Sequence, residues 1–178
     1  MPAATWMETS PPLRTVPDFP RPGIQFIDIT PWLADGGSFQ AAILELSAFA
    51  RELGVEAVAA PEARGFLVGA PIAAELGVGF VPVRKPGRLP FKSMRRDYEL
   101  EYGTAALELH VDAIRPGQRI LVVDDLLATG GTVAAAMDLI RSAGGVPVGL
   151  GFLVELTFLS GRRRLGDMPL LSLVRIDA

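Results

Sequence analysis

The sequence predicts an α/β fold in which a largely parallel, twisted sheet is flanked by helices. Short apolar runs rich in valine, isoleucine and leucine alternate along the chain with segments that carry an apolar residue every three or four positions. Strands separated by helices imply right-handed crossovers, and therefore a sheet that is covered on both faces. With 178 residues, 49% of them hydrophobic, the chain is long enough for one domain with a sizeable core.

The predicted elements follow one another in order, and glycine or proline residues separate them. We expect a loose N-terminal extension over residues 1–12 and a single domain over 13–178. Ser38 is the expected cap of the first helix and Gly54 its expected end. The predicted helices cover residues 38–53, 64–76 and 133–142. The predicted strands cover residues 57–60, 80–83, 120–123, 146–156 and 170–174.

The composition argues against several classes of protein. A formal net charge of −3 disfavours a general nucleic-acid binder, and the absence of cysteine excludes disulfides and thiolate metal sites. The single histidine, His110, excludes a histidine-based zinc site and is expected at the end of a strand. No apolar run reaches membrane-spanning length and the N-terminus lacks a signal core, so we expect a cytoplasmic protein.

Residues 120–132 carry the clearest functional pattern, Ile-Leu-Val-Val-Asp-Asp-Leu-Leu-Ala-Thr-Gly-Gly-Thr. A buried strand runs into Asp124 and Asp125, at the strand end where open α/β sheets bind ligands. The turn that follows leads into a helix, and the glycines at 130 and 131 let its backbone approach a phosphate. The two acids suit sugar hydroxyls or a magnesium ion. This pattern predicts a site for a phosphorylated sugar.

Simpler interpretations of the same residues exist. An Asp-Asp pair at a strand–helix junction can cap the next helix, and a Gly-Gly pair alone is weak evidence. All the parts in this order favour the phosphate site. No Gly-x-x-x-x-Gly-Lys-Thr sequence is present, so the pattern does not indicate a P-loop hydrolase.

Residues 120–132 resemble the phosphoribosyl-diphosphate signature of the type I phosphoribosyltransferases, and most of the chain resembles the adenine-specific branch of that family. The further matching blocks are Asp18–Pro20 with Pro22–Ile24 and Asp28–Thr30, Glu62–Phe66, Arg84–Pro90, Leu100–Gly103 and Val154–Thr157. The resemblance implies the type I fold with a small N-terminal hood over residues 13–37 and a flexible lid loop over 84–102. It also implies that Ala128, Thr129, Gly130, Gly131 and Thr132 bind the 5-phosphate, while Asp124 and Asp125 bind the ribose.

Residues 84–96 hold six basic residues and no acid. Their proline and glycine content opposes regular structure and predicts a long loop, which is either a lid or a solvated surface segment. A basic lid suits a substrate with several negative charges. The resemblance implies that Arg84 and Lys85 bind the diphosphate.

Tyr98-Glu99-Leu100-Glu101-Tyr102 follows this segment, and alternation places the tyrosines on one face and the glutamates on the other. Taken alone, the glutamates fit a solvent-facing pair. The resemblance implies that Glu101 lies beside the base and acts at purine N7, and that Tyr98 and Tyr102 belong to the lid. Ala128 supports this assignment, because the hypoxanthine–guanine family has an aspartate there that faces N7.

Glu62-Ala63-Arg64-Gly65 follows a buried strand and suits a second anion-binding loop, although Arg64 could instead form a surface ion pair. The resemblance implies a diphosphate loop made by Glu62, Ala63 and Arg64, with a cis peptide bond between Glu62 and Ala63. It also implies that Arg64 and Lys85 act in catalysis together with Glu101.

The resemblance places adenine between an N-terminal segment and two leucines. Phe26 would stack on the base, main-chain groups of Gln25 and Ile27 would read its edge, and Leu126 and Leu156 would close the other face. From the sequence alone, ordinary core packing explains Phe26 equally well. The chain departs from the family pattern at Ile27, where many members have arginine, and at Gln25, where the family residue is more apolar.

Together these residues imply transfer of 5-phosphoribosyl from 5-phospho-α-D-ribose 1-diphosphate to adenine, giving AMP and diphosphate. The resemblance further implies a Mg²⁺ ion that is held mainly by the substrate, with Asp124 and Asp125 contacting the water molecules bound to the ion. It also implies a homodimer that binds neither nucleic acid nor membrane. Two alternatives stay open: a phosphoribosyltransferase for another base, and a non-catalytic regulator that senses phosphoribosyl diphosphate.

Overall fold

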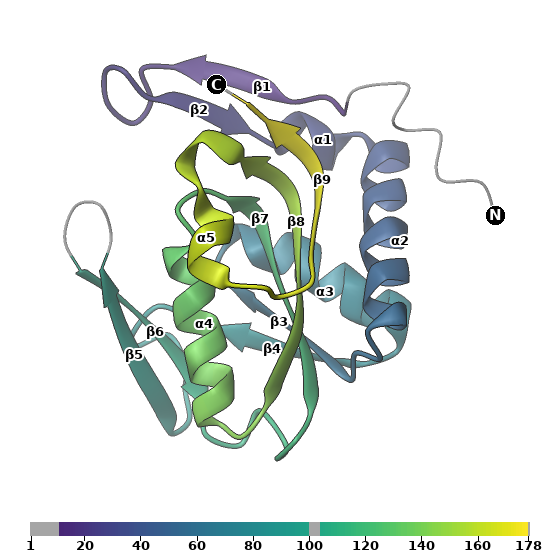
Figure 1. The fold of residues 1–178 in the computed structure, drawn as a ribbon, viewed down its shortest axis with the longest axis vertical. Coiled ribbons are helices and arrows are strands. Elements are labelled where there is room, and N and C mark those ends of the chain that lie inside the picture. The colour runs from purple at the N-terminus through teal and green to yellow at the C-terminus, as the bar shows by residue number, and fades with distance from the viewer. Residues whose placement is uncertain (1–10, 100–103, 178) are drawn as a thin grey trace. The chain divides into compact units, whose positions relative to one another are not determined.

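The computed structural model describes residues 11–99 and 104–177 of the chain. It contains two compact units, one extending to Glu45 and the other beginning at Leu46 (Figure 1). The larger unit carries the main sheet, and the smaller one carries a two-stranded sheet.

The smaller unit contains an antiparallel hairpin of β1 (Arg14–Pro17) and β2 (Gln25–Asp28), followed by the short helix α1 (Thr30–Ala34). Asp18, at a φ of 56°, accepts a hydrogen bond from the Gly23 amide at 2.7 Å and so closes the turn of this hairpin. The peptide bond between Phe19 and Pro20, in the same turn, is cis. Residues 25–27, expected to contact the base, all lie on β2.

Helix α2 (Gly36–Glu52) begins two residues earlier than predicted, and Ser38 is not its cap. Asp35 takes that role, because its Oδ1 accepts the Ser38 amide hydrogen at 2.7 Å. Hydrogen bonds from the backbone and side chain of Ser38 lower the pKa of the exposed Asp35 carboxyl. Gly54, at a φ of 58°, follows the helix end as predicted.

The larger unit is built on a five-stranded parallel sheet with the strand order β4-β3-β7-β8-β9, which confirms the predicted fold class. Helix α3 (Arg64–Leu76) connects β3 to β4, and helix α4 (Gly131–Ser142) connects β7 to β8 (Figure 1). The strands are β3 (Ala57–Pro61), β4 (Gly79–Val83), β7 (Arg119–Leu127), β8 (Val146–Leu156) and β9 (Leu170–Ile176).

Strand alternation gives this sheet two apolar faces. One face packs in a single core cluster with α4, and its buried strand residues are Ala57, Ala59, Val81, Val83, Ile120, Val122, Leu150 and Phe152. Residues of the opposite parity meet other helices. Val58 and Ala60 lie against Gly69 of α3, while Gly149 and Gly151 lie against Phe49 and Leu46 of α2. The sheet is therefore covered on both faces, as its continuous apolar runs predict.

The sequence predicted a long loop after residue 84, and this prediction is wrong from residue 93 onward. Residues 93–99 form β5 (Ser93–Glu99), which pairs antiparallel with β6 (Thr104–His110), so the irregular segment spans only 85–92. Proline and glycine are confined to that shorter segment. Met94 and Tyr98 of β5 pack against the core, which favours a strand despite the high charge around them. His110 ends β6, as predicted.

Two short helices follow β8 before the last strand: η2 (Thr157–Leu159) and α5 (Gly161–Leu165). Buried Leu165 joins α5 to the core cluster that also contains α4. Within residues 11–99 and 104–177, no helix has the length and apolar character required to cross a membrane.

Gly69→Ala tests the packing of α3 on the sheet. A Cβ at position 69 would lie 2.8 Å from Ala60 Cβ and 2.9 Å from Phe80 Cε2. Overpacking of this kind costs about 1–3 kcal/mol, more than the gain of about 1 kcal/mol that alanine brings to a helix interior. We expect a lower free energy of unfolding in urea. Gly79→Ala is the matched control, because no atom lies within 4 Å of its added Cβ; equal stability of both variants would contradict the packing.

Candidate functional site

The turn Ala128–Gly130 connects β7 to α4 and has the backbone geometry of an anion site. Gly130 is the N-terminal cap of α4 with φ 78° and ψ 0°, a left-handed conformation that favours glycine. The first amides of a helix have no partner within the helix, and a left-handed residue followed by right-handed ones turns successive amides toward a common point. The positive end of the helix dipole adds to this attraction for anions.

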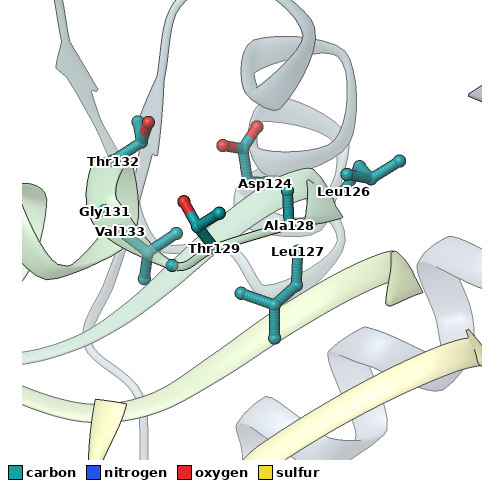
Figure 2. Close-up of a pocket in the computed structure, with 9 residues that line it drawn as sticks. Asp124, Leu126, Leu127, Ala128, Thr129, Gly131, Thr132 and Val133 are labelled. Atoms are coloured by element: carbon teal, nitrogen blue, oxygen red, sulfur yellow. The ribbon is translucent and has the colours of Figure 1, made fainter. Parts of the chain in front are cut away.

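A pocket surrounds this turn at the end of β7. It is lined by Asp124, Leu126, Leu127, Ala128, Thr129, Gly130, Gly131, Thr132 and Val133. Figure 2 shows the carboxylate of Asp124 and the hydroxyl of Thr129 on one side of the loop and the side chain of Leu127 on the other. Of the nine residues in the range 124–132, eight line this small cavity and only Asp125 does not.

The two acids of the signature lie at the carboxyl end of β7, as predicted, but in different surroundings. Because β7 continues to Leu127, Asp124 and Asp125 are consecutive strand residues and point to opposite faces. Asp124 lines the pocket, whereas Asp125 has a side chain only 6% exposed and forms an ion pair with Arg64. The Asp125 amide donates to Asp124 Oδ1 at 2.9 Å.

This arrangement changes the acidity of Asp124. Burial, followed by the charge of neighbouring Asp125, raises the pKa of the Asp124 carboxyl well above its ordinary value of 3.8. The Asp125 amide and the guanidinium of Arg64 act in the opposite direction but do not offset these effects. A ligand that donates hydrogen bonds to Asp124 would therefore supply a partner to a carboxylate that is costly to charge in the empty site.

The loop after β3 reaches the same edge of the sheet. The peptide bond between Glu62 and Ala63 is cis, which confirms that expectation. Arg64 is the first residue of α3, and its Nε donates to Asp125 Oδ2. Gly65 makes this approach sterically feasible, because a Cβ there would lie 3.0 Å from Asp124 Oδ1 and 3.3 Å from the Val123 carbonyl oxygen. The structure thus brings the two predicted anion loops together through Arg64 and the acid pair.

Arg84 adds a second cation beside the loop after β3. Its Nε donates to Glu62 Oε2 at 2.6 Å, and its Nη1 donates to the Arg88 carbonyl oxygen at 2.9 Å. The backbone of Arg84 also pairs with Glu108, which continues the line of β4. Lys85 follows as an exposed residue of the loop. Glu62 therefore orients Arg84 next to the cis peptide.

The residues expected to contact the base lie in both units. Leu126 lines the pocket at the end of β7, and Leu156 is the last residue of β8. In the smaller unit, Phe26 is half-buried and makes an edge-to-face contact with Phe19, with ring centroids 5.1 Å apart. Gln25 is exposed and Ile27 is half-buried.

Tyr98 connects the β5–β6 hairpin to the start of α4, a contact that the sequence did not predict. Its hydroxyl lies 3.4 Å from Thr132 Oγ1, and Arg96 on the same strand donates to Asp138 of α4 at 2.8 Å. Only the alternation of Arg96 and Tyr98 along the strand could have suggested that both face α4. Glu101 and Tyr102 lie outside the described residues.

The comparisons with known proteins agree with this geometry. Residues 33–162 match the phosphoribosyl transferase domain family. The chain is 55% identical to the adenine phosphoribosyltransferase of Brevibacillus brevis over 163 residues, 92% of this chain and 96% of that one. It is 53% identical to the adenine phosphoribosyltransferase of Desulfitobacterium hafniense over 163 residues, which cover 92% of this chain and 94% of that one.

A solved structure supports the same assignment. The crystal structure of adenine phosphoribosyltransferase from Thermoanaerobacter pseudethanolicus superposes with a TM-score of 0.89 at 52% sequence identity, covering 92% of this chain and 95% of that one. A family match over more than half of the chain and relatives of this identity leave no other assignment, and the chain belongs to the adenine phosphoribosyltransferase family.

Proposed function

We propose that the chain transfers the 5-phosphoribosyl group of 5-phospho-α-D-ribose 1-diphosphate to adenine, giving AMP and diphosphate. The observation that carries this proposal is the pocket at the end of β7, where an acid and a glycine-bounded amide loop face one cavity. Near-complete coverage of adenine phosphoribosyltransferases at more than 50% identity supports adenine as the base. In this reaction adenine N9 bonds to the anomeric carbon while the carbon–oxygen bond to diphosphate breaks, and the purine ring gives up one proton.

In the proposed complex, the loop from Ala128 to Thr132 holds the 5-phosphate through its amides and its two threonine hydroxyls. Asp124 accepts hydrogen bonds from the ribose hydroxyls, and Asp125 keeps Arg64 in place at the diphosphate. Charge-assisted hydrogen bonds are each worth about 1.5–3 kcal/mol, so several of them anchor the substrate firmly. Catalysis then rests on positioning and on stabilising the leaving diphosphate.

The diphosphate is the expected partner of the cations around the loop after β3. Arg64 and Lys85 would neutralise the charge that develops as it departs, and Arg84 would reach it from its bond to Glu62. Backbone groups of Glu62 and Ala63 would line the same position. A planar guanidinium suits two phosphate oxygens at once, which favours arginine for this task.

We also propose that Mg²⁺ accompanies the diphosphate. Hard carboxylate oxygens suit this ion, and Asp124 and Asp125 would hold its water molecules while substrate oxygens bind it directly. Within the part of the chain that the structure describes, no three His, Cys, Asp or Glu side chains gather into a metal-binding group. A magnesium ion shared with the substrate fits that donor set, and it would supply positive charge to the departing oxygens.

The proposed adenine site combines Phe26 stacking with edge recognition by the main chain of Gln25 and Ile27. Leu126 and Leu156 would cover the opposite face of the base. Glu101 would supply or hold the proton at purine N7, a role that needs a carboxyl with a raised pKa. We further propose that the protein works as a cytoplasmic homodimer on small-molecule substrates.

A panel of bases tests the proposed function. The protein is incubated with Mg²⁺ and phosphoribosyl diphosphate, with adenine, hypoxanthine, guanine or orotate offered in parallel, and the nucleotide formed is identified. We expect AMP alone at an appreciable rate. Formation of another nucleotide in preference to AMP would move the protein to a different base, and no nucleotide at all would favour a regulator.

Glu101→Gln tests the acid role. Loss of a general acid typically costs at least about a hundredfold in rate, so we expect kcat to fall by that factor with little change in the affinity for phosphoribosyl diphosphate. Steady-state kinetics and calorimetry measure the two quantities. Glu99→Gln is the matched control from the same segment. Equal losses in kcat and in affinity would remove Glu101 from this role.

Asp124→Asn should weaken substrate binding and at the same time stabilise the empty protein. The pKa of Asp124 is raised in the folded state, so the wild type loses stability as pH rises from the ordinary value of 3.8 through the raised one. Asparagine removes that charge but keeps an oxygen for the Asp125 amide.

With no ligand added, the difference in melting temperature between Asp124→Asn and wild type should therefore grow as the pH rises above 3.8. Calorimetry with phosphoribosyl diphosphate and Mg²⁺ should show weaker binding to the variant. Asp112→Asn, an exposed acid beyond β6, serves as control for both measurements. A melting-temperature difference that is flat with pH would refute the burial cost assigned to Asp124.

A further inference from the structure

Helix α5 lies directly against the phosphate loop. Gly161, the first residue of α5, is buried, and a Cβ there would lie 2.2 Å from the Ala128 carbonyl oxygen. From the other side, a Cβ at Gly130 would lie 2.8 Å from the Gly161 carbonyl oxygen. The two backbones are therefore in contact, with a glycine on each side. A movement of α5 would displace Ala128 and Gly130.

A bidentate ion pair fixes α5 to the sheet. The Nε of Arg162 donates to Glu155 Oε1 at 2.7 Å and its Nη2 donates to Glu155 Oε2 at 2.8 Å. Glu155 is the penultimate residue of β8 and pairs in register with Leu127, the residue that precedes Ala128. The ion pair thus joins the strand beside the phosphate loop to the helix that packs against that loop.

The burial and the hydrogen bonds of this ion pair favour a role in fixing the position of α5. The Glu155 side chain is 4% exposed, and Arg175 approaches the same carboxylate at 3.9 Å. Burial is the largest single effect and acts to raise the pKa of Glu155, but hydrogen bonds and the positive charges of Arg162 and Arg175 together outweigh it and leave the pKa below its ordinary value. Apolar residues stabilise a fold at least as well as a buried ion pair, whereas the fork of arginine on a carboxylate fixes distance and orientation.

We propose that Glu155 and Arg162 are positioning residues for the 5-phosphate site: their ion pair holds α5 against Ala128 and Gly130 and so sets the spacing of the loop amides. This inference rests on the proposed function, which makes that loop the holder of the phosphoryl group. It also gives a role to the first residue of the basic run Arg162–Arg164. Ligands that carry the 5-phosphate are the ones whose binding should report it.

Two conservative variants test the proposal, Arg162→Lys and Glu155→Gln. Each leaves one hydrogen bond possible and removes the charge-assisted fork. A shift of the loop that breaks one charge-assisted hydrogen bond between a loop amide and the phosphate would weaken binding about tenfold, or 1.4 kcal/mol. We therefore expect Kd for AMP and for ribose 5-phosphate, measured by calorimetry, to rise about tenfold. The KM for phosphoribosyl diphosphate should rise in parallel, while kcat changes much less.

Gly161→Ala disturbs the same contact without touching the ion pair, and we expect the same pattern of raised Kd and KM. Arg163→Lys, an exposed residue of the same helix, is the matched control. Circular dichroism at the assay temperature gives the folded fraction of each variant. A merely structural role would lower the folded fraction, and with it kcat, at unchanged KM.

The wild-type protein separates the two proposals. If it binds AMP and ribose 5-phosphate and the folded Arg162→Lys, Glu155→Gln and Gly161→Ala variants bind them equally well, the positioning role is wrong while the proposed function stands. If the wild type binds neither ligand and forms no nucleotide, the proposed function fails, and the positioning role fails with it.

Discussion

The site depends on backbone segments that meet at the carboxyl edge of the sheet with no side chain between them. Gly65 brings the start of α3 within contact of the end of β7, and Gly130 and Gly161 bring the phosphate loop within contact of α5. A Cβ at Gly130 or Gly161 would collide with backbone, and a Cβ at Gly65 would crowd Asp124. Because amides must point at a ligand from a short distance, a site formed from backbone and held in place by side chains suits an anion. The identities of these glycines follow from geometry alone.

Strand alternation places the two neighbouring acids, Asp124 and Asp125, in different surroundings. The same periodicity that sends Val122 toward α4 and Val123 toward the opposite face directs Asp124 into the pocket and Asp125 toward Arg64. One acid keeps an internal partner, and the other is left to be completed by a ligand. Burial and the charge of Asp125 raise the pKa of Asp124, so the charged form of this carboxyl is unfavourable in the fold. In the proposed complex, a sugar diol would donate hydrogen bonds to Asp124 and relieve part of that cost, and substrate binding and folding stability would then be coupled through this one carboxyl.

The sequence predicted what local pattern determines and missed what distant partners determine. The five strands of the main sheet and the end of α3 at Gly77 follow from apolar runs and glycine punctuation, and the structure confirms them. Asp35 was missed because Gly36 and Gly37 are poor helix formers, so Ser38 looked like the first strong signal. Strand β5 was not predicted because its backbone hydrogen bonds depend on pairing with β6, which the residues of β5 alone do not reveal. The ion pair of Arg64 with Asp125 and that of Arg162 with Glu155 join different elements, and no spacing rule reports them. The cis peptide at Glu62 was foreseen only through family resemblance.

The basic segment that the sequence suggested as a uniformly cationic lid is instead partly neutralised within the chain. Arg84 binds Glu62, Arg95 binds Asp97 and Arg96 binds Asp138. An incoming diphosphate must therefore compete with carboxylates for some of these guanidiniums. For Arg84 the exchange is favourable in geometry, because Glu62 already holds it beside the loop that would receive the diphosphate. Replacing one anion by another leaves the local charge balance nearly unchanged. A site arranged in this way recruits a cation without leaving it unpaired beforehand, which limits the electrostatic cost of the empty state.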